Sequence, residues 1–245
     1  MSLVKILHGG LDIILKPIYP PFCLLCDENT IKFPSLVCSD CINNIPSFEP
    51  PLCSICGLPL EGNEFCLHCE KQTEIFSRIS SYGPYNSSLG ELIRLFKFNS
   101  RTFLLNVLGE CIYKSFKRDL EGMEHDAIIP VPLHLFRYLS RGFNQSALLS
   151  KYLSERSGIP VAENWLLRIK NTRQQSLLNA EERKHNLKNA FKIKKKRTDL
   201  KKVILVDDVY TTGSTARACS EELYKEEVEE ITILTVARTY RDTSA

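Results

Sequence analysis

"VILVDDVYTTGST", residues 203–215, joins an apolar run to two adjacent aspartates and then to a stretch of threonine, glycine and serine. A continuous apolar run of this kind is typical of a strand buried on both faces of a parallel sheet. Asp207 and Asp208 stop the run, so we expect them at the carboxyl end of the strand. Ligands of open parallel sheets bind outside the carboxyl ends of the strands, so the pair marks an expected binding site.

The loop "TTGST" (211–215) follows the acid pair and is expected to lead into a helix. Free backbone N–H groups, hydroxyls and a helix N-terminus together form a cradle for an anion. Gly213 lets the main chain approach that anion closely. Carboxylates can accept hydrogen bonds from vicinal hydroxyls while the loop holds a phosphate, so the combination predicts a sugar-phosphate site. The alternative is an ordinary polar turn between a strand and a helix.

Strands and helices alternate on both sides of this stretch. The strand patterns are "IFSRISSYGPY" (75–85), "DAIIPVPL" (126–133) and "EITILTVAR" (230–238). Helical patterns occupy 87–98, 102–116, 144–158 and 214–224. The first, "SSLGELIRLFKF", opens with a capping serine, and the third reads "NQSALLSKYLSERSG". This alternation predicts an α/β domain with a Rossmann-like parallel sheet over residues 75–245.

Four Cys-x-x-Cys pairs precede this domain, with eleven residues between the first two pairs and nine between the last two. Two thiolates of one tight turn can reach one metal, and two such turns close a tetrahedral site. Soft thiolates in that geometry select zinc or iron–sulfur chemistry. We expect a double zinc ribbon over 22–72 with two structural zinc ions held by Cys23, Cys26, Cys38, Cys41, Cys53, Cys56, Cys66 and Cys69. Sequential pairing is the default; an interleaved pairing and a disulfide framework are the alternatives.

Residues 1–21 are apolar at helical spacing, but two glycines and an aspartate interrupt the run, and no small-residue cleavage site follows. We expect an amphipathic helix that docks on the rest of the protein, with weak membrane association as the alternative. No apolar stretch is long enough to span a bilayer. A cytoplasmic location, where thiols stay reduced, suits the cysteines.

The basic residues are unevenly distributed. The formal net charge is only +3, yet between residues 151 and 202 fifteen Lys and Arg stand against five Asp and Glu. Such a stretch can serve phosphates or nucleic acid, and a solvated surface is the alternative.

The acid pair and its loop resemble the motif with which type I phosphoribosyltransferases bind 5-phosphoribosyl-1-pyrophosphate (PRPP). Three further segments resemble the ComF family of competence proteins: the cysteine pairs, "PVPLHLFRYLSRGFNQS" (130–146) and "RIKNTRQQSLLNAEERKHNLKNAF" (168–191). Together they cover nearly the whole chain. The resemblance implies a type I phosphoribosyltransferase fold, preceded by a small zinc-binding module and binding PRPP with Mg²⁺.

The resemblance also implies roles for single residues. Asp207 and Asp208 would hold the ribose hydroxyls, directly or through Mg²⁺. The 5-phosphate would be bound by Thr211, Thr212, Gly213, Ser214 and Thr215. Arg141 and Arg137 are candidates for stabilising the pyrophosphate charge, because Arg makes bidentate phosphate contacts. For Arg137 an exposed position on a helix is the alternative. No general base for an incoming nucleophile is evident.

By the same resemblance the protein would act in natural transformation, handling incoming single-stranded DNA in the cytoplasm. Its partners would be a DNA-uptake helicase and proteins that process single-stranded DNA, and the uptake machinery could bring it to the membrane. The basic segment 168–202 would contact DNA phosphates. Two alternatives stay open: a metabolic phosphoribosyltransferase that acts on an unidentified acceptor, and a zinc-organised interaction protein in which the transferase domain is only a platform.

Overall fold

The computed structural model describes residues 22–28, 36–60, 66, 69, 75–98, 102–170, 187 and 189–239. The chain divides into two compact units, Met1–Ile45 and Pro46–Ala245. The division falls between the second and third Cys-x-x-Cys pairs, so each unit holds one group of four cysteines. The N-terminal helix expected over 1–21 lies outside the described residues, and the domain limits 22–72 and 75–245 stay a prediction.

The described part of the first unit contains the short helix α2, Ser39–Asn43. The helix begins after Cys38, whose sulfur accepts a hydrogen bond from the N–H of Cys41 at 3.4 Å. A second turn is closed by the N–H of Asp27, which donates to the carbonyl oxygen of Cys23 at 3.0 Å. Each Cys-x-x-Cys pair of this unit therefore lies in a tight turn.

The second unit is built on a sheet of four parallel strands in the order β1-β6-β5-β2. The strands are β1 Arg78–Pro84, β2 Ala127–Pro130, β5 Lys202–Tyr210 and β6 Glu230–Arg238. The apolar run of β5 is buried throughout, as a central parallel strand requires. The predicted parallel α/β sheet is therefore confirmed.

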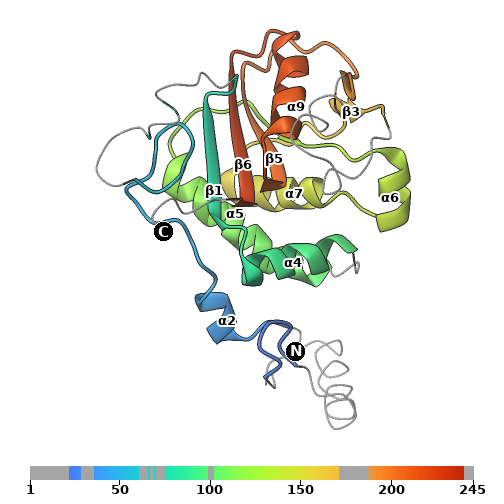
Figure 1. Cartoon of the computed structure of the whole chain (residues 1–245). Helices are drawn as coiled ribbons and strands as arrows, with labels where there is room; N and C mark the ends of the chain where they lie inside the picture. Colours follow the sequence, from blue (N-terminus) through green and yellow to red (C-terminus); the bar gives the residue numbers. More distant parts are fainter. Residues whose placement is uncertain are drawn as a thin grey trace, which may run out of the picture. The chain divides into compact units, whose positions relative to one another are not determined.

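Helices cover both faces of this sheet (Figure 1). The helices that pack on the sheet are α5 Leu105–Asp119, α7 Gln145–Ser157 and α9 Ser214–Tyr224. Helix α4 Ser87–Phe98 contacts α5, and α6 Leu135–Arg141 lies to the side of the sheet. Val203 and Leu205 of β5 share a core cluster with Cys219 of α9. The strand residues between them point to the opposite face, because side chains alternate along a strand. On that face α5 and α7 pack against the sheet.

Two local expectations were wrong. β5 does not stop at the two aspartates; it continues to Tyr210, because β6 still pairs with it through Val209 and Tyr210. The acid pair therefore lies inside a paired strand. Helix α4 begins after Asn86, whose Oδ1 accepts from the N–H of Leu89 at 3.0 Å, so the cap lies one residue before the expected position.

Four of the described elements were not predicted. They are α2, α6 and the antiparallel pair β3 Leu166–Arg168 and β4 Phe191–Ile193. All four are too short to show a hydrophobic period in the sequence. Within the described part of the chain, none of the helices has the length and hydrophobicity needed to cross a bilayer.

Candidate ligand site and cysteine centres

A cavity of about 640 Å³ lies at the carboxyl end of the sheet. Residues that follow each of the four strands line it: Tyr85 after β1, Val131 after β2, Thr211 after β5 and Thr239 after β6. All the transferase-site residues predicted from the sequence line this cavity except Ser214. The side chain of Ser214 is buried, with its oxygen 3.1 Å from Thr212 Oγ1.

The two aspartates present their carboxylates to the cavity from β5. Asp207 Oδ1 accepts hydrogen bonds from Ser146 Oγ at 3.0 Å and from the N–H of Asp208 at 2.9 Å. Asp208 is buried and forms an ion pair with Lys97, whose Nζ lies 2.7 Å from Asp208 Oδ2. Burial, together with the adjacent charge of Asp208, raises the pKa of Asp207 to about 7. The groups around the two carboxylates therefore do not fully compensate their negative charge. This favours a cation or hydroxyl donors as ligands.

Sequence reasoning missed Lys97 and Ser146. Ser146 is the last residue of "RGFNQS", so the resemblance contained a signal for it. Lys97 comes from the last turn of α4, and nothing in its neighbourhood along the chain distinguishes it from a surface lysine. Only the parallel arrangement of the strands brings it to Asp208.

The loop 211–215 makes a sharp turn at Gly213, which caps α9 with a left-handed φ of 72°. A β-carbon at this position would lie too close to the phenol of Tyr210, and the left-handed φ itself favours glycine. The carbonyl oxygen of Thr211 accepts a hydrogen bond from Thr239 Oγ1 at 3.2 Å. The N-terminus of α9 follows directly, and the N–H groups and the dipole at a helix N-terminus favour an anion.

Arginine side chains from other elements also line the site. Arg137 and Arg141 come from α6, Arg168 comes from β3, and all three line the cavity. Burial lowers the pKa of Arg141, against the opposing effect of the two aspartates. Burial and then the charge of Arg137 lower the pKa of Arg168 to about 10. These cations destabilise one another, so a multiply charged anion would relieve the repulsion.

The first group of cysteines forms one cluster. The four sulfurs of Cys23, Cys26, Cys38 and Cys41 all lie within 4.8 Å of one another. Burial would raise the pKa of Cys23, but the N–H groups of Cys38 and Leu25 donate to its sulfur and bring the pKa down to about 6. A stabilised thiolate and four converging sulfurs fit a tetrahedral structural zinc ion.

The second group, Cys53, Cys56, Cys66 and Cys69, forms an equivalent cluster. The sequential pairing is thus the one found, and all ten cysteines of the chain are free of disulfide bonds. Three of these four cysteines belong to the hydrophobic core of the second unit. The turn that carries Cys53 and Cys56 is joined to β1, because the N–H of Ile79 donates to the carbonyl oxygen of Ile55 at 2.7 Å.

Comparison with known proteins found a family model, curated relatives and solved structures that match this chain. The double zinc ribbon domain matches residues 14–70. Competence protein F of Haemophilus influenzae is 38% identical over 222 residues, which are 88% of this chain and 96% of that protein. DNA utilization protein YhgH of Salmonella typhimurium is 31% identical over 224 residues, 90% of this chain and 98% of that protein. Adenine phosphoribosyltransferase of Saccharomyces cerevisiae is 16% identical with a TM-score of 0.36, over 58% of this chain and 72% of that one.

The parallel sheet with its acid pair and glycine loop, joined to two four-cysteine centres, defines a phosphoribosyltransferase-like protein with a double zinc ribbon. The identity shared along almost the full length of competence protein F then gives the family. The chain belongs to the ComF family of competence proteins.

Proposed function

We propose that this protein binds PRPP together with Mg²⁺ in the cavity at the carboxyl end of the sheet. One observation carries the proposal: two carboxylates, a glycine loop at a helix N-terminus and a group of arginines converge on one cavity of about 640 Å³. That volume lies within the range of roughly 300–1,000 Å³ usual for small-molecule sites.

Each part of PRPP has a matching part of the site. The vicinal ribose hydroxyls donate to Asp207 and Asp208, which would also hold Mg²⁺, since carboxylate oxygens are the protein ligands this ion prefers. The 5-phosphate occupies the loop 211–215 at the start of α9. The pyrophosphate faces Arg137 and Arg141, whose guanidinium groups suit bidentate phosphate contacts.

The proposal is for binding, and transfer is a separate question. The described residues that line the cavity include no histidine and no carboxylate besides Asp207 and Asp208. Because the ribose engages both carboxylates in this proposal, neither of them is assigned as a general base for an acceptor. Pyrophosphate displacement from PRPP would be assisted mainly by fixed charges, with Mg²⁺ balancing the negative charge of the leaving group.

Titration of the full-length protein with PRPP and Mg²⁺, followed by thermal unfolding, tests the proposal. At a ligand concentration of 100 times Kd, binding adds about 2.7 kcal/mol to the stability of the folded state. Ribose 5-phosphate, which lacks the pyrophosphate, is the control and should stabilise less. No shift with PRPP at any Mg²⁺ concentration would contradict the proposal. Pyrophosphate release across a panel of bases and amines then separates a metabolic transferase from a protein that only binds PRPP.

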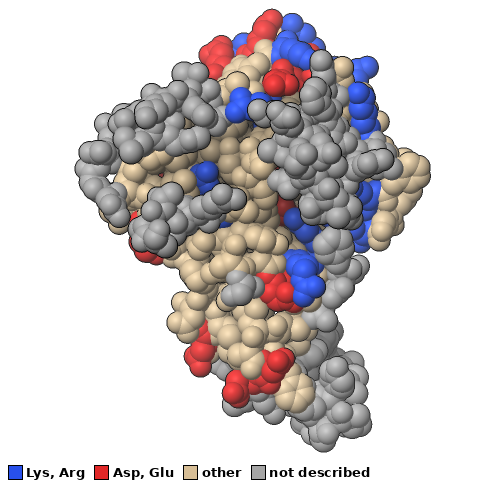
Figure 2. All heavy atoms as spheres, in the orientation of Figure 1, with Lys and Arg blue, Asp and Glu red and all other residues tan. Residues whose placement is uncertain are grey.

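We further propose that this PRPP-binding protein handles single-stranded DNA during natural transformation. The names of its relatives, a competence protein and a DNA utilization protein, support the proposal. By the same resemblance it would work in the cytoplasm beside the uptake machinery, with the uptake helicase and DNA-processing proteins as partners. The described basic residues 194–197 are a candidate phosphate contact. Figure 2 shows Lys and Arg on the side of the molecule that carries β3 and α6 in Figure 1.

The basic run 194–197 is partly balanced by acids. Lys196 Nζ lies 3.2 Å from Glu227 Oε1, and Arg197 Nη2 lies 2.7 Å from Asp199 Oδ2. Exposed ion pairs of this kind are worth only about 0–1 kcal/mol, so DNA phosphates can replace the carboxylates.

Changing Lys194, Lys195, Lys196 and Arg197 together to serine is expected to weaken binding of single-stranded DNA. Each lost phosphate contact should reduce the slope of log K against log salt by about 0.7. A matched control changes Lys114 and Lys117 of α5 to serine, which should leave both quantities near the wild-type values. Fluorescence anisotropy over a series of salt concentrations measures affinity and slope. If the fourfold variant keeps the wild-type slope, the DNA site lies elsewhere.

A further inference from the structure

Two buried side chains link the second cysteine centre to the phosphate loop. Tyr210 is the last residue of β5 and Arg238 is the last residue of β6, and the two are paired in the sheet register. Only 9% of Tyr210 and 8% of Arg238 is exposed. A buried guanidinium needs hydrogen bonds and compensating charge, so its surroundings are informative.

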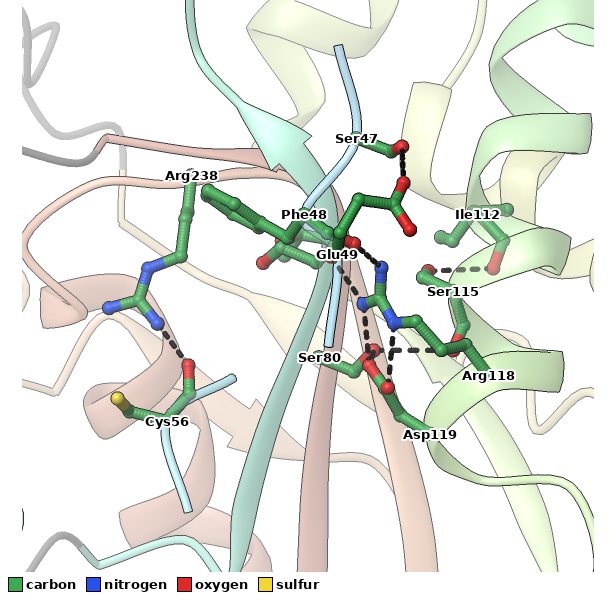
Figure 3. A network of polar contacts seen from close by, with 12 residues as sticks. Ser47, Phe48, Glu49, Cys56, Ser80, Ile112, Ser115, Arg118, Asp119 and Arg238 are labelled. Carbon is green, nitrogen blue, oxygen red and sulfur yellow. Dashed lines mark hydrogen bonds and ion pairs between the residues drawn. The ribbon is translucent and has the colours of Figure 1, made fainter. Parts of the chain in front are cut away.

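Arg238 contacts the cysteine centre directly. Its Nη1 donates a hydrogen bond to the carbonyl oxygen of Cys56, as Figure 3 shows. Cys56 is one of the four residues whose sulfurs converge in the second cluster. A zinc ion with four thiolates carries a net charge of −2, so an adjacent buried guanidinium compensates charge there as well as fixing the turn that carries Cys56.

The other side of Arg238 contacts Tyr210. The guanidinium carbon lies 4.9 Å from the centroid of the Tyr210 ring, a cation–π distance. Phe76 packs edge-on against the same ring, with centroids 6.2 Å apart. The ring is therefore held between a cation and an aromatic side chain.

Tyr210 in turn sets the position of the loop. Its phenol occupies the space beside Gly213 that a β-carbon would need. Its carbonyl oxygen accepts from the N–H of Thr239 at 2.9 Å, while Thr239 Oγ1 donates to Thr211 at 3.2 Å. The start of the turn, at Thr211, is thus bonded to Thr239, and its middle, at Gly213, lies against the phenol of Tyr210.

We propose that Arg238 and Tyr210 are positioning residues through which the second cysteine centre holds the loop 211–215 in its anion-binding conformation. Tyr210 also lines the cavity, and in this proposal both residues act on the backbone that binds the ligand. The part of the inference that concerns ligand affinity rests on the proposed PRPP function. The part that concerns loop order does not, so the two can be tested separately.

Hydrogen exchange of the ligand-free, zinc-loaded full-length protein tests the loop order. Arg238→Met and Tyr210→Leu should each raise amide exchange in residues 211–216 by about tenfold, as a coupling of ordinary size would. Zinc content should stay at that of the wild type. Arg238→Lys, which keeps the charge and a donor, should restore most of the protection. If the two residues only supported the general fold, the variants would raise amide exchange throughout the unit. Arg238→Lys would then not restore protection in the loop alone.

Arg118 provides a matched control in the same unit. It is also largely buried, and it donates to the carbonyl oxygens of Phe48 at 2.7 Å and Ser81 at 2.9 Å while pairing with Asp119 (Figure 3). Arg118→Met therefore removes an equivalent anchor that involves neither Cys56 nor Tyr210. It should lower overall stability and leave exchange in the loop at the wild-type level.

PRPP affinity, measured by calorimetry on the same proteins, should fall about tenfold in Arg238→Met and Tyr210→Leu and stay unchanged in Arg118→Met. If amide exchange in the loop stays at the wild-type rate in both variants, the proposed coupling between the second cysteine centre and the loop is wrong. If the exchange result holds but the wild type does not bind PRPP, the proposed function fails and the coupling stands. Should Arg238→Met not fold, Tyr210→Leu decides, because that variant leaves the hydrogen bond from Arg238 to Cys56 in place.

Discussion

Replacing Asp207 and Asp208 together with asparagine is expected to lower the affinity for PRPP and Mg²⁺ by at least ~100-fold, because each charge-assisted hydrogen bond contributes roughly 1.5–3 kcal/mol. Asparagine has nearly the same shape as aspartate, so the cavity keeps its form while its negative charge is lost. Calorimetric titration measures the effect. Wild-type affinity in this variant would show that the acid pair does not hold the ligand.

The same substitution at Asp207 alone should stabilise the ligand-free protein above neutral pH. Burial and the charge of Asp208 raise the pKa of Asp207 from 3.8 to about 7. Between these values the folded state binds a proton that the unfolded state releases, so the free energy of unfolding falls as pH rises through this window. Asparagine removes this dependence. The gain of Asp207→Asn over the wild type should therefore be larger at pH 8 than at pH 5.

Urea denaturation at the two pH values measures this gain. Asp199→Asn is the control, because Asp199 is an exposed carboxylate whose pKa is lowered by its hydrogen bond from Arg197. That variant should show no gain at pH 8. A gain for Asp207→Asn that is equal at both pH values would contradict the assignment of a raised pKa. Greater stability with lost affinity is the pattern expected of a binding site that holds unfavourable charge.

Loss of the second cysteine centre is expected to have the largest effect on stability. Cys53, Cys56 and Cys69 belong to the same core cluster as Phe76 and Ile79. Structural zinc contributes apparent binding free energies of roughly 10–16 kcal/mol in small zinc modules, and part of that supports the fold here. Cys56→Ser with Cys69→Ser should lower the melting temperature of the second unit by at least ~10 °C, at roughly 2–4 °C per kcal/mol.

The first cysteine centre supplies the matched control. Cys26→Ser with Cys41→Ser removes the same number of ligands from the separate unit Met1–Ile45. Zinc content should fall by one ion per chain in each double variant, but only the variant in the second centre should shift the main calorimetric transition. Equal shifts in both would mean that the two centres support the fold in the same way, against the division of the chain into two units.

The two centres therefore differ in a way that the sequence does not indicate. The four Cys-x-x-Cys pairs look alike along the chain, and their spacing predicts two similar zinc modules. The second centre nevertheless packs on β1 through Ile55 and Ile79 and on the end of β6 through Arg238. Such contacts depend on apolar and charged partners far along the chain, which no local spacing records.

Features with a short repeat or a short spacing could be predicted from the sequence itself. The apolar run 203–206 determined a buried strand, because four consecutive apolar residues need cover on both faces of a sheet. The Cys-x-x-Cys spacing determined the zinc ligands, because a tight turn brings two sulfurs to one metal. Gly213 marked the sharp turn of the loop, since its left-handed conformation is open mainly to glycine.

The tertiary structure decided which of the distant side chains meet. Lys97 reaches Asp208, Ser146 reaches Asp207, and Arg168 faces the same cavity, although each comes from a different element. Pairing with β6 also carried β5 past the acid pair to Tyr210, which placed that ring between Arg238 and the loop. Strand order and burial determine these contacts, because ion pairs and packing depend on the distance between side chains in space. The helical and strand periods that a sequence shows depend only on neighbours along the chain.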